Sequence, residues 1–468
     1  MKNKKVHTFC DDVLGDLDAT AVAKMIREKS VSSSEFTEAA IERAVKVKDI
    51  LNPIAYEAFE QAIKDSRKHP TGLFAGVPTF VKDNSEVKGM PMRNGSEAST
   101  SKPDKKNGPF VGQFLKMGFT VLGKSRLPEF GFTATTEYAN QEPCRNPWHT
   151  DYSTGGSSGG SAAMVAAGVV PIAHGNDGGG SIRIPAACCG LVGLKSTRGR
   201  FIENFSGRAL PVKIISDGVL TRSVRDTARF FSAMEWVWQN KKLPPVGNIT
   251  GPGKKRMRIG LVIDSITGNP TCPETRAVVE ETAALLESMG HRVEPMDIQV
   301  PDTFIEDFTL YWSMLAFLLK NFGKVLFAPE FDARRFEPFS KGLAEHFRKN
   351  IRKAPAAIYR LRQSGEEYTR GISGYDAVLS PVLAHTVPKI GYLDPNTEFY
   401  ELFRKLTNYV SFTPLNNASG SPAISLPMGS DSKGLPIAVQ IQSHHGGERV
   451  LLELAYELEE ARPFRRIE

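Results

Sequence analysis

Residues 155–183 read GGSSGGSAAMVAAGVVPIAHGNDGGGSIR, and the rest of the chain is best interpreted outward from this stretch. Two serines beside glycines, Ser157 and Ser181, enclose a run of Ala, Val and Gly. Glycine is used where the backbone takes a positive φ or passes close to other atoms, and it weakens regular structure elsewhere. Two such clusters therefore indicate a constructed site. We interpret the stretch as the active site of a serine hydrolase.

The composition is that of an ordinary globular protein of 468 residues, with 41% hydrophobic and 24% charged residues. We find no apolar run long enough to span a membrane and no secretory signal at the N-terminus. The net charge of +7 is mild for this length and does not by itself indicate nucleic-acid binding. Five cysteines without a CxxC pair favour reduced thiols, so we expect a cytoplasmic protein.

Helix and strand patterns alternate along most of the chain. Residues 16–66 have helical spacing, and 73–83 is typical of a buried strand ending at Lys82 and Asp83. We expect further helices over 110–118, 157–170, 218–234, 272–290 and 447–461, and strands over 119–125, 170–177, 258–264, 376–383, 422–428 and 434–443. This alternation predicts an α/β fold whose sheet is covered by helices on both faces. We expect one domain over 1–468, with a compact core over 73–235.

Ser181 follows three consecutive glycines, Gly178, Gly179 and Gly180. Successive N–H groups at a strand end can converge on one point and bind an anion. An acyl-transfer enzyme needs such a nest for the oxyanion of its tetrahedral intermediate. The pattern favours Ser181 as a nucleophile, although a glycine-rich turn with a helix-capping serine explains it equally well.

The base for such a serine is less obvious. Histidine is the usual base, but none of the nine histidines has a recognisable partner pattern. Lys82 ends an apolar strand, where burial would lower its pKa and let it take a proton. Ser157 could then relay the proton between Lys82 and Ser181, because a hydroxyl donates and accepts at once. The plainer alternatives are a salt-bridged lysine and a serine that caps the following helix.

Three blocks of the sequence resemble the motifs of the amidase signature family in order and spacing. They are Gly76-Val-Pro-x-x-x-Lys82-Asp83, the run from Gly155 to Ser161, and Asp177-Gly-Gly-Gly-Ser-Ile-Arg183-Ile-Pro185. Shorter matches occur at Asn146-Pro-Trp148, Ser421-Pro-Ala-Ile-Ser-Leu-Pro427 and Gly434-Leu-Pro-Ile-Ala-Val-Gln440. The likeness covers residues 15–465 and is weakest between 240 and 375.

The resemblance implies a single α/β/α domain with a large mixed sheet and no metal or organic cofactor. It implies a triad of Ser181 as nucleophile, Ser157 as a bridging serine with a cis peptide bond, and Lys82 as base. It further implies an oxyanion hole from the N–H groups of Gly178, Gly179, Gly180 and Ser181, supported by Asp177, Arg183 and Ser158. The implied reaction is the hydrolysis of a carboxylic amide to acid and amine or ammonia through an acyl-enzyme.

The segment from His174 to Pro185 is similar to that of stand-alone amidases, including the 6-aminohexanoate cyclic-dimer hydrolase group. The A subunits of tRNA-dependent amidotransferases usually have Thr at position 178 and Gln at position 184, where this chain has Gly178 and Ile184. A partner-dependent subunit of that kind, which hydrolyses glutamine, remains an alternative. We expect a small-molecule amide substrate, no nucleic acid and no membrane span, and a homodimer is left open.

An α/β-hydrolase is the other alternative. Gly155-Gly-Ser157-Ser-Gly159 satisfies the GxSxG pattern, which would make Ser157 the nucleophile, with Asp376 and His385 as partners. The acyl pocket is expected to come largely from 125–155 and from a substrate-side region over 300–415. Phe and Leu between Phe304 and Phe327 suggest an apolar acyl group, although a core helix explains them as well.

Overall fold

A computed structural model describes residues 4–68, 70–99, 102–204, 207, 210–298 and 300–467. Its main sheet has eight strands in the spatial order β10 (Arg292–Pro295), β9 (Arg258–Leu261), β11 (Ala377–Pro381), β13 (Pro436–Ser443), β12 (Ala423–Ser430), β7 (Val192–Lys195), β8 (Ser216–Thr221) and β6 (Ile172–Asp177). The strands β10, β9 and β11 are parallel, and the other neighbouring pairs are antiparallel. The predicted α/β fold with a large mixed sheet is therefore confirmed.

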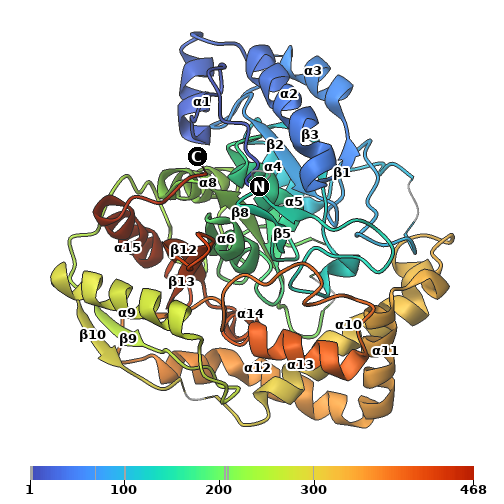
Figure 1. Ribbon diagram of the computed structural model, residues 1–468, viewed down its shortest axis with the longest axis vertical. Helices are drawn as coiled ribbons and strands as arrows, with labels where there is room; N and C mark the ends of the chain where they lie inside the picture. The colour runs from blue at the N-terminus through green and yellow to red at the C-terminus, as the bar shows by residue number, and fades with distance from the viewer. Residues whose placement is uncertain are drawn as a thin grey trace.

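Helices pack on this sheet, on a smaller second sheet or on one another. In chain order they are α1 (Ala19–Arg27), α2 (Ser33–Leu51), α3 (Phe59–Ser66), α4 (Pro109–Leu115), α5 (Gly159–Ala166), α6 (Arg183–Cys189), α8 (Val224–Val237), α9 (Pro273–Ser288), α10 (Phe304–Leu326), α11 (Pro338–Asn350), α12 (Ala354–Gly371), α13 (Phe399–Tyr409), α14 (Pro414–Ser419) and α15 (Glu448–Ala461). Every residue of β13 is buried, as expected for a strand covered on both faces. Figure 1 shows α1–α3 at the top of the molecule and α12 and α13 along the bottom. Within the described ranges, no helix has the length and apolar character needed to cross a bilayer.

A second, smaller sheet positions the predicted lysine. It has three strands in the order β1 (Ile54–Glu57), β3 (Thr120–Ser125) and β2 (Pro78–Lys82), and a separate ribbon pairs β4 (Arg145–Asn146) with β5 (His149–Ser153). The edge strand β2 lies beside β6, the edge strand of the main sheet, where Thr79 Oγ1 donates to the Ile172 carbonyl at 2.9 Å. The last residues of β2 and β6 therefore meet where the two sheets adjoin.

Three element predictions need correction. The expected helical segment 16–66 is interrupted by β1, a short strand that pairs with β3. The helix expected over 157–170 is shorter, because α5 ends at Ala166. The stretch 218–234 begins as part of the strand β8, which pairs with both β6 and β7. The helix α8 begins only at Val224, after the capping residue Ser223, whose hydroxyl accepts a hydrogen bond from the Asp226 N–H. Pairing on both sides overrides the helical pattern of this segment.

The buried Arg43 is one of several residues that hold the N-terminal segment on the core. Arg43, whose side chain is 1% exposed, donates to both carboxylate oxygens of Asp12 and to the carbonyl of Gly168. We expect Arg43→Ala to lower the free energy of unfolding by about 3 kcal/mol, because it leaves the buried Gly168 carbonyl and the partly buried Asp12 carboxylate without these donors. Denaturant titration of the variant measures this loss. Arg67→Ala, which breaks an exposed pair with Glu38, should cost less than about 1 kcal/mol, and equal losses would contradict the prediction.

Candidate active site

Lys82 and Ser157 are in direct contact where the two sheets adjoin. Lys82 is the last residue of β2, and its Nζ donates to Ser157 Oγ at 2.7 Å. The same Nζ donates to Asn176 Oδ1, also at 2.7 Å. Lys82 has no exposed surface and Ser157 is 3% exposed, so the contact lies in the protein interior. The structure thus brings together two residues that are 75 positions apart in the sequence.

Burial lowers the pKa of Lys82 to about 7, although the carboxylates of Asp177 and Asp217 act in the opposite direction. An ordinary lysine has a pKa of about 10.4 and is almost fully charged at neutral pH. With its lowered pKa, a large fraction of Lys82 is a free amine at neutral pH. One of its N–H groups then binds the amide oxygen of Asn176, and its lone pair can accept the proton of Ser157.

The peptide bond between Gly156 and Ser157 is cis. The next residue, Ser158, donates its hydroxyl to the Ser181 carbonyl at 2.5 Å and also contacts the Asn176 carbonyl at 3.3 Å. Ser158 is the residue that precedes α5, but its side chain makes no capping bond to that helix. Ser157, the serine to which the plainer alternative assigns a capping role, is hydrogen-bonded to Lys82 instead. The Ser158 hydroxyl joins the Ser157 turn to the Ser181 turn.

Asp177 shapes the glycine loop from inside the protein. Its carboxylate accepts from the Gly180 N–H at 2.7 Å and from Arg183 Nε at 2.9 Å, and neither charged side chain has exposed surface. Burial alone would raise the pKa of Asp177, but the charge and hydrogen bonds of Arg183 hold it well below its usual range. Gly180 has φ +132°, and a Cβ there would lie 2.3 Å from Thr413 Oγ1, so only glycine fits.

The N–H groups of the glycine loop are not all equivalent. That of Gly180 is bound to Asp177, whereas those of Gly178, Gly179 and Ser181 make no hydrogen bond to another residue that the structure describes. Thr413 Oγ1 donates to the Gly179 carbonyl at 2.6 Å and holds the loop from the other side. Three N–H groups in one short loop thus remain available for an anion.

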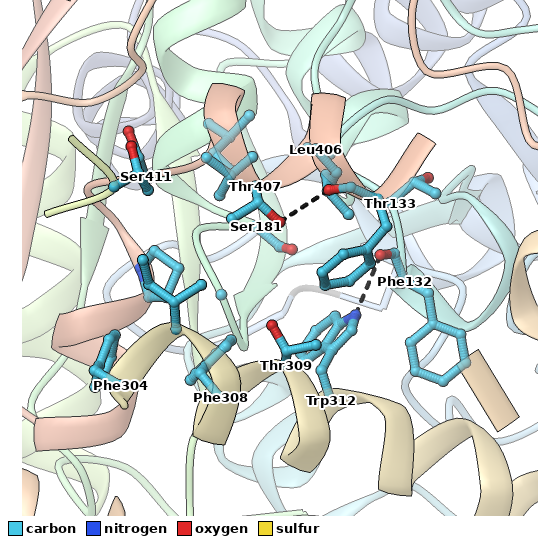
Figure 2. Close-up of a pocket in the computed structure, with 18 of the residues that line it drawn as sticks. Phe132, Thr133, Ser181, Phe304, Phe308, Thr309, Trp312, Leu406, Thr407 and Ser411 are labelled. Atoms are coloured by element: carbon cyan, nitrogen blue, oxygen red, sulfur yellow. Dashed lines mark hydrogen bonds between the residues drawn. The ribbon is translucent and has the colours of Figure 1, made fainter. Parts of the chain in front are cut away.

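Ser181 opens onto a cavity with an aromatic wall. Figure 2 shows Ser181 with the rings of Phe132, Phe308 and Trp312 around the same space. Trp312 Nε1 donates to the Phe132 carbonyl at 3.3 Å, which ties α10 to the loop around Phe132. Gly131 also lines this cavity, and a Cβ there would lie 2.9 Å from Ser157 Oγ. The cavity therefore borders Ser181 directly, and Ser157 lies behind Gly131 in its wall.

No charged side chain lines this cavity among the residues that the structure describes. Its walls carry aromatic and aliphatic side chains together with a few hydroxyls, from Phe132, Thr133, Ile184, Ile266, Thr267, Phe304, Ile305, Phe308, Thr309, Trp312, Phe403, Leu406, Thr407, Val410 and Ser411. More than half of the lining residues lie within the region 300–415 that the sequence predicts to form the substrate side, and α10 and α13 supply eight of the twenty. An apolar, uncharged group is the chemical complement of such a wall.

The residues of the α/β-hydrolase alternative have other partners. Asp376 binds Lys255 and accepts from the Arg258 N–H, and the ring of His385 stacks on Tyr409. Among the described residues, neither side chain is hydrogen-bonded to Ser157. Across the same ranges, no group of three or more His, Cys, Asp or Glu side chains is arranged to hold a metal ion.

Sequence reasoning missed several residues that shape the site. Asn176 holds the lysine amine, and His174, on the same face of β6, contacts the Lys82 backbone. The two-residue spacing of a strand is a signal that could have identified them, because 172, 174 and 176 face the same side. Asn417 donates to Asp177 from α14, and nothing in the sequence around position 417 indicates this contact.

Comparison with known proteins agrees with this geometry. The chain matches the Amidase family over residues 35–452. It is 47% identical over 466 residues to the "Putative amidase AmiC" of Mycobacterium leprae (strain TN), with 99% of both chains covered. It is 33% identical to the 6-aminohexanoate-cyclic-dimer hydrolase of Paenarthrobacter ureafaciens, covering 96% of this chain and 95% of that protein.

Solved structures give the same result. The structure of 6-aminohexanoate cyclic dimer hydrolase complexed with substrate has a TM-score of 0.86 at 30% identity, covering 97% of this chain and 98% of that one. A bacterial aryl acylamidase of the amidase signature enzymes has the same fold, with a TM-score of 0.85 at 23% identity. The chain therefore belongs to the amidase family, with the amidase signature fold, and is a hydrolase of amide carbon–nitrogen bonds.

Proposed function

We propose that this amidase works through an acyl-enzyme on Ser181, with Ser157 and Lys82 as the proton relay. The observation that carries the proposal is the 2.7 Å hydrogen bond between Lys82 Nζ and Ser157 Oγ, at a lysine without exposed surface. A buried amine with a pKa of about 7 is suited to take a proton at neutral pH. Ser158 supports Ser181 by holding its carbonyl.

In the proposed reaction, Ser181 Oγ attacks the amide carbon while its proton passes to Ser157 and the Ser157 proton passes to Lys82. The oxyanion accepts hydrogen bonds from the N–H groups of Gly178, Gly179 and Ser181, since that of Gly180 is bound to Asp177. The carbon–nitrogen bond then breaks, and the relay returns one proton to the leaving amine. Water next attacks the ester, which releases the acid and restores the Ser181 hydroxyl.

The proposal is tested by labelling the purified chain with a fluorophosphonate probe, which phosphonylates activated serines. We expect the label on the peptide that contains Ser181, and no label in Ser181→Ala. Label on Ser157 would instead support the α/β-hydrolase alternative. The same preparation should hydrolyse simple amides without a partner protein. Glutaminase activity that requires a second protein would favour the amidotransferase-type subunit and overturn the proposal of a stand-alone amidase.

The uncharged cavity beside Ser181 leads us to propose an amide whose acyl group is apolar and carries no charge. Hexanamide and benzamide represent this class, and 6-aminohexanamide carries an ammonium group on the same chain length. We expect the wild-type enzyme to prefer hexanamide, because an ammonium in this cavity would lose its hydration without gaining a charged partner. Comparable kcat/KM values for the two would contradict the proposal.

A single charge in the cavity wall should reverse this preference. Thr309 lines the cavity from α10. We expect Thr309→Asp to shift the ratio of kcat/KM for 6-aminohexanamide over hexanamide upward by about 100-fold, because the carboxylate attracts the ammonium. Asn321→Asp, at an exposed position on the same helix, is the matched control and should leave the ratio unchanged. An unchanged ratio in Thr309→Asp would show that the acyl group binds elsewhere.

A further inference from the structure

The catalytic lysine proposed above lies on one sheet and the serine loop follows a strand of the other. The strands β2 and β6 belong to different sheets, and side chains link them at their ends. Thr79 binds the Ile172 carbonyl, Lys82 Nζ binds Asn176, and the backbone N–H of Lys82 donates to His174 Nδ1 at 3.2 Å. The imidazole of His174 therefore accepts the Lys82 N–H, whereas in a paired β2 and β6 a backbone carbonyl would accept it.

The contacts of His174 fix its tautomer. Because Nδ1 accepts the Lys82 N–H, its lone pair faces the backbone and the ring proton must be on Nε2. Nε2 lies 3.3 Å from Asp217 Oδ1, which accepts a hydrogen bond from the Nε2–H group. The ring has no exposed surface and packs against Phe110 and Phe114, with centroids 5.2 and 6.0 Å away. Burial lowers the pKa of His174, in keeping with a neutral ring.

We infer that His174, held in one tautomer by Asp217, is a positioning residue that sets the place of Lys82 in the proton relay. The inference rests on the role proposed for Lys82. The ring does not touch the Lys82 amine or either serine through a hydrogen bond of the described residues, so it acts through the backbone of β2. A lysine Nζ at 2.7 Å from Ser157 leaves little room for displacement, and a shift of about 1 Å in such a group can cost about 100-fold in rate.

Two replacements of His174 separate positioning from packing. His174→Asn keeps an acceptor, since the Asn oxygen can occupy nearly the position of Nδ1, but it loses the bond to Asp217. His174→Leu fills the space and keeps no acceptor. We expect His174→Leu to lower kcat for hexanamide about 100-fold with KM changed less than about threefold, and His174→Asn to stay within about tenfold of the wild type. Thermal melts should show both variants similarly destabilised.

A purely structural role predicts a different result. Loss of the ring packing would then lower Tm and kcat together, and kcat would be no higher in His174→Asn than in His174→Leu. Equal kcat values for the two variants would therefore overturn the inference. If His174→Leu does not fold, Asp217→Asn provides the test. An amide at 217 can donate to Nε2 and favours the Nδ1–H tautomer, which opposes the Lys82 N–H. We expect kcat to fall about tenfold or more, and an unchanged kcat would overturn the inference.

Failure of this inference can be told apart from failure of the proposed function. If His174→Leu and Asp217→Asn match the wild type while Lys82→Met is inactive, the relay stands and the positioning role of His174 is wrong. If Lys82→Met itself retains full activity, the relay is wrong, and His174 then has no lysine to position.

Discussion

Lys82→Met is expected to lower kcat for a simple amide by about 10³- to 10⁴-fold, with KM changed less than about threefold. Methionine has nearly the length of lysine and no amine, so it fills the buried position without accepting a proton. The expected loss in kcat is large because, in the proposed mechanism, the Lys82 amine is both the base for Ser181 and the source of the proton for the leaving group. Steady-state kinetics on the purified variant measure it, with circular dichroism to show that the fold is retained.

The same amine should determine the pH dependence. Lys82 must be neutral to accept a proton, and its pKa is lowered to about 7. Below this value kcat/KM should fall about tenfold for each pH unit, and above it the rate should level off. Lys82→Arg keeps a cation that does not deprotonate in this range and should be as inactive as Lys82→Met. Full activity in either variant, or a flat profile from pH 5 to pH 9, would contradict the role of Lys82.

Arg183→Met is expected to lower the free energy of unfolding by about 3–5 kcal/mol, because it leaves the carboxylate of Asp177 buried without a counter-charge. The change also removes donors from Gln440 and Asn417, which accept from the guanidinium at 2.7 Å each. The glycine loop is held by Asp177, so kcat should fall as well. Denaturant titration together with kinetics measures both effects.

The double variant Asp177→Asn with Arg183→Met tests the cause of this loss. It removes the unpaired charge, so we expect it to regain part of the stability that Arg183→Met loses, although not its activity. Arg276→Met breaks a partly exposed pair with Asp264 and should cost less than about 1 kcal/mol. If the double variant were instead less stable than Arg183→Met, as two independent losses would make it, the charge argument would be wrong.

Much of the fold could be predicted because segments with helical spacing alternate with short strand-like segments along the chain. The strands expected over 119–125 and 170–177 correspond to β3 and β6, and the mixed sheet is confirmed. The pattern predicts a helix from Gly218 because residues 218–221 run into α8 without a break, and only their pairing with β6 and β7 makes them part of the strand β8. Such pairing depends on residues far away in the sequence.

The residues of the candidate site also fall into those that the sequence identifies and those that it does not. Lys82, Ser157 and Ser181 carry a motif, and the contact between the first two is present, while their chemical roles stay predictions. Asn176 and His174 carry no motif, because their function depends on β2 lying beside β6. The pocket walls could be assigned to a region but not to residues, since an aromatic helix in a cavity wall has the same pattern as one in a core.

The groups proposed for the chemistry all lie between positions 82 and 183, whereas more than half of the residues that line the cavity lie within 300–415. The residues that react and the residues that would select the acyl group are therefore only partly separated along the chain, because Phe132, Thr133 and Ile184 also line the cavity. A chimera that takes residues 300–415 from a relative with another acyl preference should inherit part of that preference without any change to the reacting groups. This partial separation offers a simple route by which the acyl preferences of enzymes with this architecture diverge, through changes in the cavity wall that leave the reacting groups unchanged.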